Sequence, residues 1–526
     1  MGVRVGQCFE GDLYFGNNST CFQGEGLGLL ASSERDISTM QVAAWSADYM
    51  VRLLVSGVIG WVSLVWSLSV IVGAVLTLKN AVQNKCRRRV PFPDSTSQGV
   101  WTIHGKHYDL SSWASHHPGG KFALDLGRNR DCTGLFESYH IFANQDMLKK
   151  TLARYELSSE EAALRGVEAS TEGNATGLEF NDPFHADVKA MAREHFGERS
   201  HKMKLSTGVV CGFFLVAQMV AICAFLAGSQ AAVFLLPFVS WIVSSNLAHD
   251  ASHFAISRRP WLNRLASYTS LPFFFGSTGW HLQHVVQHHV YTNDSDDVDL
   301  YHFLPAVRVS RLTKHSEAFK LQLLSFFVVL PTVVGHLLFT VPMDLLTGQL
   351  DAATGERRYS QAQGLDDFVG RFFRSILFEF IGGICWIPLS LYCLGFHQGL
   401  GRICLVYTVC SYLFVIFTQG AHLQKDCMVG KEEEFKSWAR RQAATSVNFG
   451  VGSGLLCFVA GGLNMQSLHH VLPGVSSCHF SDLWPKYKEV CRRHGVELKE
   501  CSSLFSFFGG FLGWLSELAV EAEDER

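Results

Sequence analysis

Long apolar stretches predict that much of this chain lies in a membrane. Residues 53–78 carry no charge and are long enough to cross a bilayer, which takes about 20 mostly apolar residues. Further apolar stretches form two hairpins, each of which leaves from and returns to a side rich in lysine and arginine. They are residues 205–228, 231–248, 375–395 and 403–421. The pattern predicts a mainly α-helical integral membrane protein with a four-span core and one extra N-terminal span.

The charges beside the first stretch predict its orientation. Lys79 and three consecutive arginines at 87–89 follow it, whereas acidic residues predominate among the charges before it. The positive-inside rule then places residues 1–52 in a lumen and the next segment in the cytosol. A cleaved signal peptide is the alternative, but the stretch is too long and too far from the start to suit one. In a lumen, the sequons that begin at Asn17 and Asn18 would be available for glycosylation.

One apolar stretch, residues 321–346, is harder to place. Two prolines, a histidine and an aspartate interrupt it. If it crossed the membrane, the histidines before and after it would lie on opposite faces. We therefore predict that it lies in the interface, as does the shorter apolar segment 265–275. Glu379, near the start of the third of the four core spans, is interpreted as an interfacial residue.

Composition supports a membrane protein and excludes some other classes. Hydrophobic residues make up 48% of the 526 residues and charged residues only 17%. A net charge of -3 gives no electrostatic surface for nucleic acid. The 15 cysteines include no C-x-x-C pair, so neither a zinc module nor a thioredoxin-like site is indicated.

Residues 91–160, between the first two spans, carry histidines suited to haem. A His-Pro-Gly-Gly sequence begins at His117, and His140 follows later. Two imidazole ligands leave no open position on haem iron, which favours electron transfer. Glycines after His117 allow the tight turn that directs its ring into a pocket. The segment, which starts near Trp101, resembles a cytochrome b5 domain. The resemblance implies an α+β fold that binds haem b through His117 and His140.

Three further histidine clusters follow the hairpins: HDASH at 249–253, HVVQHH at 284–289 and QSLHH at 466–470, and His422 ends the last span. Histidines four residues apart share one face of a helix, as a pair of metal ligands must. All three clusters lie on the same predicted side of the membrane. Imidazole suits iron, copper and zinc, so the metal stays open. Seven or more nitrogen ligands are too many for one ion, which predicts two.

These clusters resemble the three histidine boxes of membrane fatty acid desaturases. The resemblance extends to the front-end group, which carries an N-terminal cytochrome b5 domain and a glutamine at the start of the third box. Matching stretches include WHLQHVVQHHVYTN, WARRQAATSVN and GGLNMQSLHHVLPGV. The similarity covers residues 98–506. The first 90 residues, with their extra span, are not part of the usual pattern.

The resemblance implies a di-iron centre with a defined set of ligands. The box histidines are His249, His253, His284, His288, His289, His469 and His470. His422 is an expected further ligand. Gln466 stands where related desaturases place a histidine, so it is expected to ligate a metal weakly or to hold a water. His281 is expected outside the ligand set. The acidic run at 294–299 is either a solvated turn or a source of carboxylates that orient the ligands.

The implied reaction inserts a cis double bond into a polyunsaturated long-chain fatty acid, using O2 and electrons from NADH. The electrons would pass through an NADH-cytochrome b5 reductase and the fused haem. Delta-5 or delta-4 action is favoured and delta-6 action stays open. The alternatives are a sphingoid-base delta-8 desaturase, a b5-fused lipid hydroxylase and a non-enzymatic electron carrier. The expected location is the endoplasmic reticulum, with the haem domain and the boxes facing the cytosol.

These expectations divide the chain into six parts. They are a lumenal segment at 1–52, an anchor at 53–78, a haem domain at 91–160, a polar linker at 161–204, a membrane desaturase domain at 205–506 and an acidic tail at 507–526. The linker is expected to be a mobile tether that raises the effective concentration of the haem domain beside the core.

Overall fold

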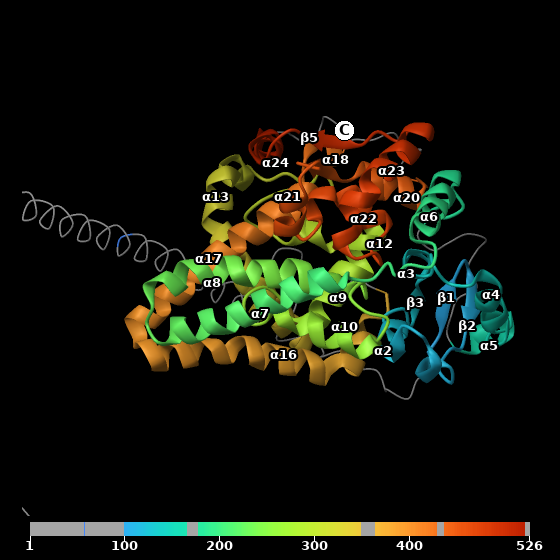
Figure 1. Cartoon of the computed structure of the whole chain (residues 1–526), viewed down its shortest axis with the longest axis horizontal. Coiled ribbons are helices and arrows are strands. Elements are labelled where there is room, and N and C mark those ends of the chain that lie inside the picture. Colours follow the sequence, from blue (N-terminus) through green and yellow to red (C-terminus); the bar gives the residue numbers. More distant parts are fainter. Residues whose placement is uncertain (1–56, 58–98, 166–176, 349–362, 429–435, 521–526) are drawn as a thin grey trace, which may run out of the picture. The chain divides into compact units, whose positions relative to one another are not determined.

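The computed structural model describes Gly57 and residues 99–165, 177–348, 363–428 and 436–520. The predicted lumenal segment and its sequons lie outside these residues, as does the predicted anchor apart from Gly57. From residue 99 onward the described chain belongs to one compact unit (Figure 1). The expected combination of a mainly helical membrane protein and a small α+β domain is confirmed.

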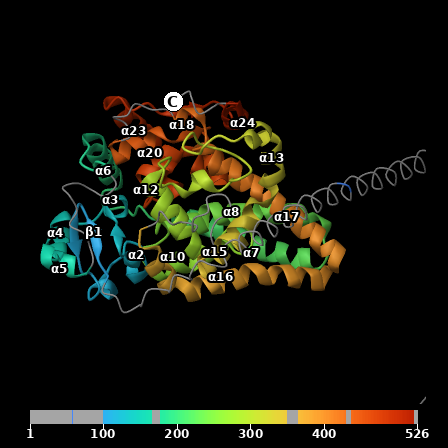
Figure 2. The same cartoon turned by 180° about the vertical axis from the view of Figure 1, so that it is seen from behind.

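The four predicted core spans are long apolar helices. They are α7 (Leu205–Leu226), α8 (Gln230–Val243) with its continuation to Ser252, α16 (Leu365–Leu394) and α17 (Phe396–Phe417). Figures 1 and 2 show them side by side. Gly228 and Gly395, with φ of 88° and 77°, make the tight turns of the two hairpins, because side chains other than glycine disfavour that conformation. Many side chains of α7 are exposed and apolar, as expected of a lipid-facing helix.

The ambiguous stretch forms a fifth long apolar helix, Glu317–Thr347, which satisfies the length and composition of a span. Prolines break it into α-helical, 3-10 and π-helical turns, among them α13 (Gln322–Val329), α14 (Val333–Gly335) and α15 (Val341–Thr347). It packs against α16 and α17. Its interfacial position stays a prediction. The segment 265–275 is not one helix, because α10 (Pro260–Ala266) and a 3-10 turn end by Ser270 and three buried phenylalanines follow.

The N-terminal domain has the expected α+β form. Strands β2 (Lys106–Tyr108), β1 (Trp101–Ile103) and β3 (Arg130–Asp131) form a sheet in that order, antiparallel and then parallel. The helices are α2 (Gly120–Asp125), α3 (Thr133–Tyr139), α4 (Gln145–Ala153) and α5 (Ser159–Leu164), with a 3-10 turn at Ala114–His116. Trp101, Ile103 and Leu110 fill a small core.

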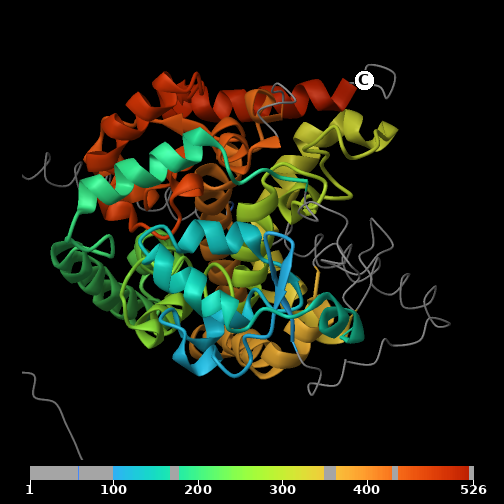
Figure 3. The ribbon, with the colours of Figure 1, turned by 90° about the vertical axis from the view of Figure 1, so that its right-hand side faces the viewer.

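The prediction of a mobile tether is wrong for the described part of the linker. Helix α6 (Pro183–Phe196) packs against α23 (Phe480–Arg493), as Figure 3 shows for the blue-green helix below the red C-terminal helices. Phe184, Val188 and Phe196 recur every four or eight residues and bury one face of α6, which the polar composition concealed. Asp182 caps the helix and accepts a hydrogen bond from Arg440.

The boundary placed at residue 506 is also wrong. The membrane domain continues through α24 (Leu504–Val520), which is apolar and buries one face in the largest core cluster. A parallel pair of strands, β4 (Val447–Phe449) and β5 (Lys499–Cys501), brings the chain to that position. Helices α18 (Lys425–Met428), α20 (Trp438–Ala444), α21 (Gly454–Ala460) and α22 (Gln466–Val471) complete this part.

The burial of α24 predicts the effect of shortening one side chain. Phe507 is 0% exposed and its ring lies 4.2 Å from that of Phe449, whereas Phe505 on the same helix is 92% exposed. Phe507→Ala should destabilise the unit by about 3–5 kcal/mol through the cavity that it leaves. The melting temperature of the detergent-solubilised protein measures this, with Phe505→Ala as the control. Equal melting temperatures for the two variants would contradict the packing of α24.

Candidate functional site

The two predicted haem ligands face each other across a gap. The ring centroids of His117 and His140 lie 6.1 Å apart. In each ring Nδ1 meets a backbone carbonyl, that of Gly120 at 3.1 Å and that of Phe136 at 2.8 Å. Each ring therefore directs Nε2 into the gap. Burial lowers the pKa of His117 to about 4 and also lowers the pKa of His140. Both imidazoles are neutral at pH 7, the form that binds iron.

The gap opens into a cavity of about 580 Å³ that suits a flat apolar macrocycle. Its walls within the domain include Trp113, Phe136, Met147, Leu148 and Leu152. The membrane domain contributes the remaining lining, from residues 201–202, from several residues of 254–263, from Val285 and from residues 474–475. The residues present fit haem, and the cavity is shared between the two domains.

The three histidine boxes come together in one buried cluster. His249 begins α9 (His249–Ser252), the second box occupies a π-helical segment, His281–His288, with α12 (His289–Tyr291), and the third lies on α22. Nε2 of His284 lies 3.1 Å from Nε2 of His249 and 3.2 Å from Nε2 of His289. The π-helical turns, which widen a helix locally, also precede the first box at Ser244–Ala248.

Ring nitrogens in this cluster suit metal ions. Four of them, on His249, His253, His289 and His469, are buried and have no hydrogen-bond partner among the described residues. A buried polar atom without a partner costs about 1–3 kcal/mol, so the cluster is unfavourable unless something binds between the rings. The ligand atoms of His249, His253, His284 and His469 lie within 4.8 Å of one another, and so do those of His288, His422 and His470. The predicted ligands are therefore brought together.

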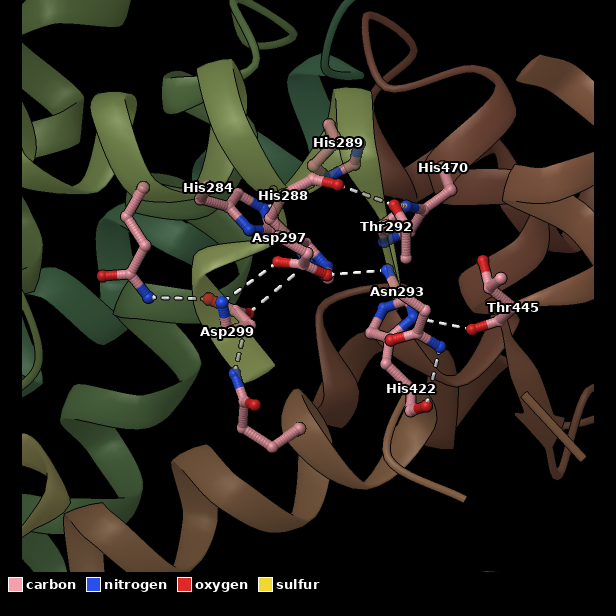
Figure 4. Close-up of polar contacts among 12 residues, drawn as sticks. His284, His288, His289, Thr292, Asn293, Asp297, Asp299, His422, Thr445 and His470 are labelled. Atoms are coloured by element: carbon pink, nitrogen blue, oxygen red, sulfur yellow. Dashed lines mark hydrogen bonds and ion pairs between the residues drawn. The ribbon is translucent and has the colours of Figure 1, made fainter. Parts of the chain in front are cut away.

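Polar groups behind the rings fix their orientation. Nδ1 of His288 faces Asp297 at 3.1 Å and Asp299 at 3.5 Å (Figure 4). Burial opposes a charge on His288, but the two carboxylates outweigh it and raise the pKa of His288 to about 9. His422 meets the carbonyl of Thr445 at 2.9 Å, and His470 meets Oε1 of Gln442 at 2.8 Å. Such partners orient metal-binding imidazoles.

The acidic run thus divides by role. Asp297 and Asp299 are buried beside the cluster, whereas Asp294 pairs with Arg441 at the margin. Gln466 is buried between two rings, with Nε2 2.8 Å from His422 and 3.3 Å from His470. Its side chain closes this side of the cluster.

Two other residues singled out in the sequence, Glu379 and His281, lie near the cluster but are not among its ligands. Glu379 is buried and accepts hydrogen bonds from the backbone N–H and the hydroxyl of Thr278, and its interfacial position stays a prediction. His281 lies outside the cluster, as expected, and its ring contacts Phe122 of the haem domain with centroids 4.8 Å apart.

Sequence reasoning missed Gln442, Thr445 and Tyr139 as partners of the ligands. Gln442 and Thr445 lie in the WARRQAATSVN stretch, where a glutamine and a threonine beside the third box were the available signal. Tyr139 lies in the haem domain, and its hydroxyl is 2.8 Å from Nδ1 of His253. Its position directly before His140 was the only signal for it in the sequence.

The site defines a class of protein: one with membrane-type helices and a buried histidine cluster suited to metal ions, joined to a domain whose cavity suits haem. Comparison with known families agrees with both halves. Residues 92–157 match the family described as "Cytochrome b5-like Heme/Steroid binding domain", and residues 224–502 match "Fatty acid desaturase". The chain belongs to the fatty acid desaturase family, in its cytochrome b5-fused form. Membership makes it a membrane oxidoreductase that acts on fatty acids.

Curated relatives cover most of this chain. An "Acyl-lipid omega-13 desaturase" of Chlamydomonas reinhardtii is 30% identical over 80% of this chain and 93% of its own length. An "Acyl-lipid (8-3)-desaturase" of Mortierella alpina is 26% identical over 80% and 94%. A "Delta(5) fatty acid desaturase A" of Dictyostelium discoideum is 28% identical over 76% and 87%.

The contact between Asp297 and His288 predicts that removing the charge of Asp297 weakens metal binding. Asp297→Asn keeps the size of the side chain but removes the charge that orients the ring, and should lower iron affinity or activity about 10–100-fold. The iron content of the purified protein and product formation measure this. Asp296→Asn is the matched control, because Asp296 has no hydrogen bond or ion pair within the described chain. Full iron content and full activity in Asp297→Asn would contradict the orienting role.

Proposed function

We propose that this protein is a front-end acyl desaturase whose histidine cluster holds two irons. The observation that supports two positions is that ligand atoms converge in two groups with no residue in common, which a third group of His289, His469 and His470 joins. One group comprises His249, His253, His284 and His469. The other comprises His288, His422 and His470, beside Gln466. His289 lies between the groups, near His284 and stacked on His470 with ring centroids 4.0 Å apart.

The iron would supply the activation of O2 that allows hydrogen to be removed from an unreactive methylene. The chain's own residues prepare the site for this. Gln442 and Thr445 accept hydrogen bonds from Nδ1 of His470 and His422, which leaves the lone pair of Nε2 in each ring for a metal. Asp297 would hold the Nδ1 proton of His288 when a metal replaces the proton on its Nε2. Trp280 stacks on His284 with centroids 4.3 Å apart, and Phe275 stacks on Trp280 at 4.2 Å. These rings form an apolar wall that excludes water from one side of the cluster.

The proposed substrate is a polyunsaturated long-chain acyl lipid, desaturated at delta-5 or delta-4. A substrate with an apolar tail suits a site enclosed by helices that also face lipid. The relatives named for Delta(5) and (8-3) desaturation support the delta-5 assignment. Electrons would come from NADH through a cytochrome b5 reductase to the haem domain. The proposed location is the endoplasmic reticulum, with this domain in the cytosol.

Expression in a yeast that lacks polyunsaturated fatty acids tests this function. Cells fed defined fatty acids should convert a polyunsaturated substrate into a product with one more double bond towards the carboxyl end. Gas chromatography with mass spectrometry identifies the bond. His288→Ala should abolish the product, and His117→Ala should greatly reduce it while the membrane domain stays folded.

Each other result selects a different function. A hydroxylated product would exclude desaturation, and a product from sphingoid bases alone would indicate a sphingolipid enzyme. The absence of any product, in protein with intact haem absorbance, would support an electron carrier.

A further inference from the structure

The haem pocket and the histidine cluster meet at one hydrogen bond. Tyr139 ends α3 and directly precedes the haem ligand His140, and it lines the haem cavity. Its hydroxyl lies 2.8 Å from Nδ1 of His253, and the two rings are nearly parallel, at 21°. The chain therefore links the two sites by one peptide unit, one side chain and one hydrogen bond.

The other nitrogen of His253 faces the cluster. Its Nε2 is buried without a hydrogen-bond partner among the described residues, and its ring lies 4.5 Å from that of His289 and 4.9 Å from that of His284. An imidazole that binds a metal through Nε2 carries its proton on Nδ1, which then donates outward. The acceptor here is the phenolic oxygen of Tyr139. One domain thus supplies the outer partner for a ligand in the other.

Several contacts around this hydrogen bond hold the domains together. Arg128 of the haem domain pairs with Asp367 of α16 at 3.2 Å, and both side chains are about nine-tenths buried or more. The backbone of Gly134 passes so close to Val290 that an added Cβ would lie 3.0 Å from its side chain. These contacts join the haem domain to the membrane domain on the elements before and within α3, which carries Tyr139, so packing holds Tyr139 against His253.

We propose that Tyr139 is a positioning residue that couples the haem to the metal centre. It would hold the ring of His253 and complete the bonded route from His140 for electron transfer. Each transfer oxidises the haem by one electron and reduces the metal site by one, with no bond made or broken. This proposal rests on the proposed function, because it requires a metal centre that accepts electrons from the haem.

Tyr139→Phe tests the route, because it removes the hydroxyl and keeps the ring. The full-length protein is reduced with NADH and the reductase, then mixed with O2 and substrate, while haem absorbance is followed by stopped flow. We expect haem reoxidation, measured per bound iron, to be at least tenfold slower than in the wild type, with unchanged haem reduction by NADH and unchanged haem content. The iron content itself should fall, because the hydroxyl also orients the ligand His253. Tyr155→Phe is the control, because the hydroxyl of Tyr155 has no partner among the described residues. His288→Ala gives the background rate.

The outcomes separate this proposal from the proposed function. An unchanged reoxidation rate in Tyr139→Phe would overturn the route. A reoxidation rate that equals the wild-type rate once both are divided by iron content would also overturn it, because the hydroxyl would then serve only to hold the ligand. If the wild type reoxidises no faster than His288→Ala with any acyl substrate, the proposed function itself fails.

A second observation concerns two cations in the wall of the haem cavity. Lys202 precedes α7 and Arg258 lies between α9 and α10, so both belong to the membrane domain, yet both line this cavity. Neither has a carboxylate within 4.0 Å in the described chain, and Nζ of Lys202 meets only the carbonyl of Gly474, at 3.4 Å. Burial and the charge of Arg258 lower the pKa of Lys202 to about 8, which leaves it mostly protonated at pH 7.

We infer that Lys202 and Arg258 bind the carboxylates of the haem. Haem carries two such groups on one edge, and two cations with no carboxylate within 4.0 Å in the described chain line the part of the cavity that the membrane domain contributes. The haem would then bridge the domains, with its iron ligands in one and its carboxylate ligands in the other.

Reconstitution of the full-length apoprotein with haem and with haem dimethyl ester tests this. The Lys202→Met, Arg258→Met double variant should bind haem at least tenfold more weakly than the wild type, but bind the neutral ester equally well. Its midpoint potential with haem should fall, because nearby cations stabilise the reduced haem. Lys149→Met, Lys150→Met, on the exposed face of α4, is the control. Equal losses for both porphyrins, or no loss with haem, would overturn the assignment.

Discussion

The structure depends on the burial of eight imidazole rings around a common centre. Their ring nitrogens are desolvated, and several have no hydrogen-bond partner among the described residues, so the arrangement is costly unless metal ions bind between the rings. The surrounding elements supply partners for other ring nitrogens. These partners are carboxylates from the turn after α12, an amide from α20 and a phenol from the haem domain. The long helices position these short segments, and the unusual π-helical turns occur where the ligands converge.

The features that repeat along the sequence could be predicted from it. The core spans follow from uninterrupted apolar stretches, and the ligands follow from histidines at helical spacing. The haem pair follows from His117 and His140 with their flanking glycines and aromatic residues. In each case residues close together in the sequence show the pattern, because a bilayer-spanning helix needs a continuous apolar stretch and a pair of metal ligands on one helix needs a fixed spacing.

The features that depend on contacts between distant segments could not. Helix α6 looks like a polar linker because only one face is apolar, and that face becomes buried only when α23 packs against it. The apolar part of α24 is short and is followed by acids, so composition suggested a tail. The partner of His253 comes from 114 residues away in the sequence, and a tyrosine beside a haem ligand has no periodicity that would mark it.

The packing of the haem domain against the membrane domain restricts which amino-acid substitutions the two domains can accept. A freely tethered donor could be exchanged between enzymes without regard to its surface. Here the donor surface contains Tyr139, Gly134 and Arg128, each fitted to a residue of the membrane domain. A chimaera that received a foreign haem domain would lose these matched pairs, so substitutions on one side of the boundary constrain those accepted on the other.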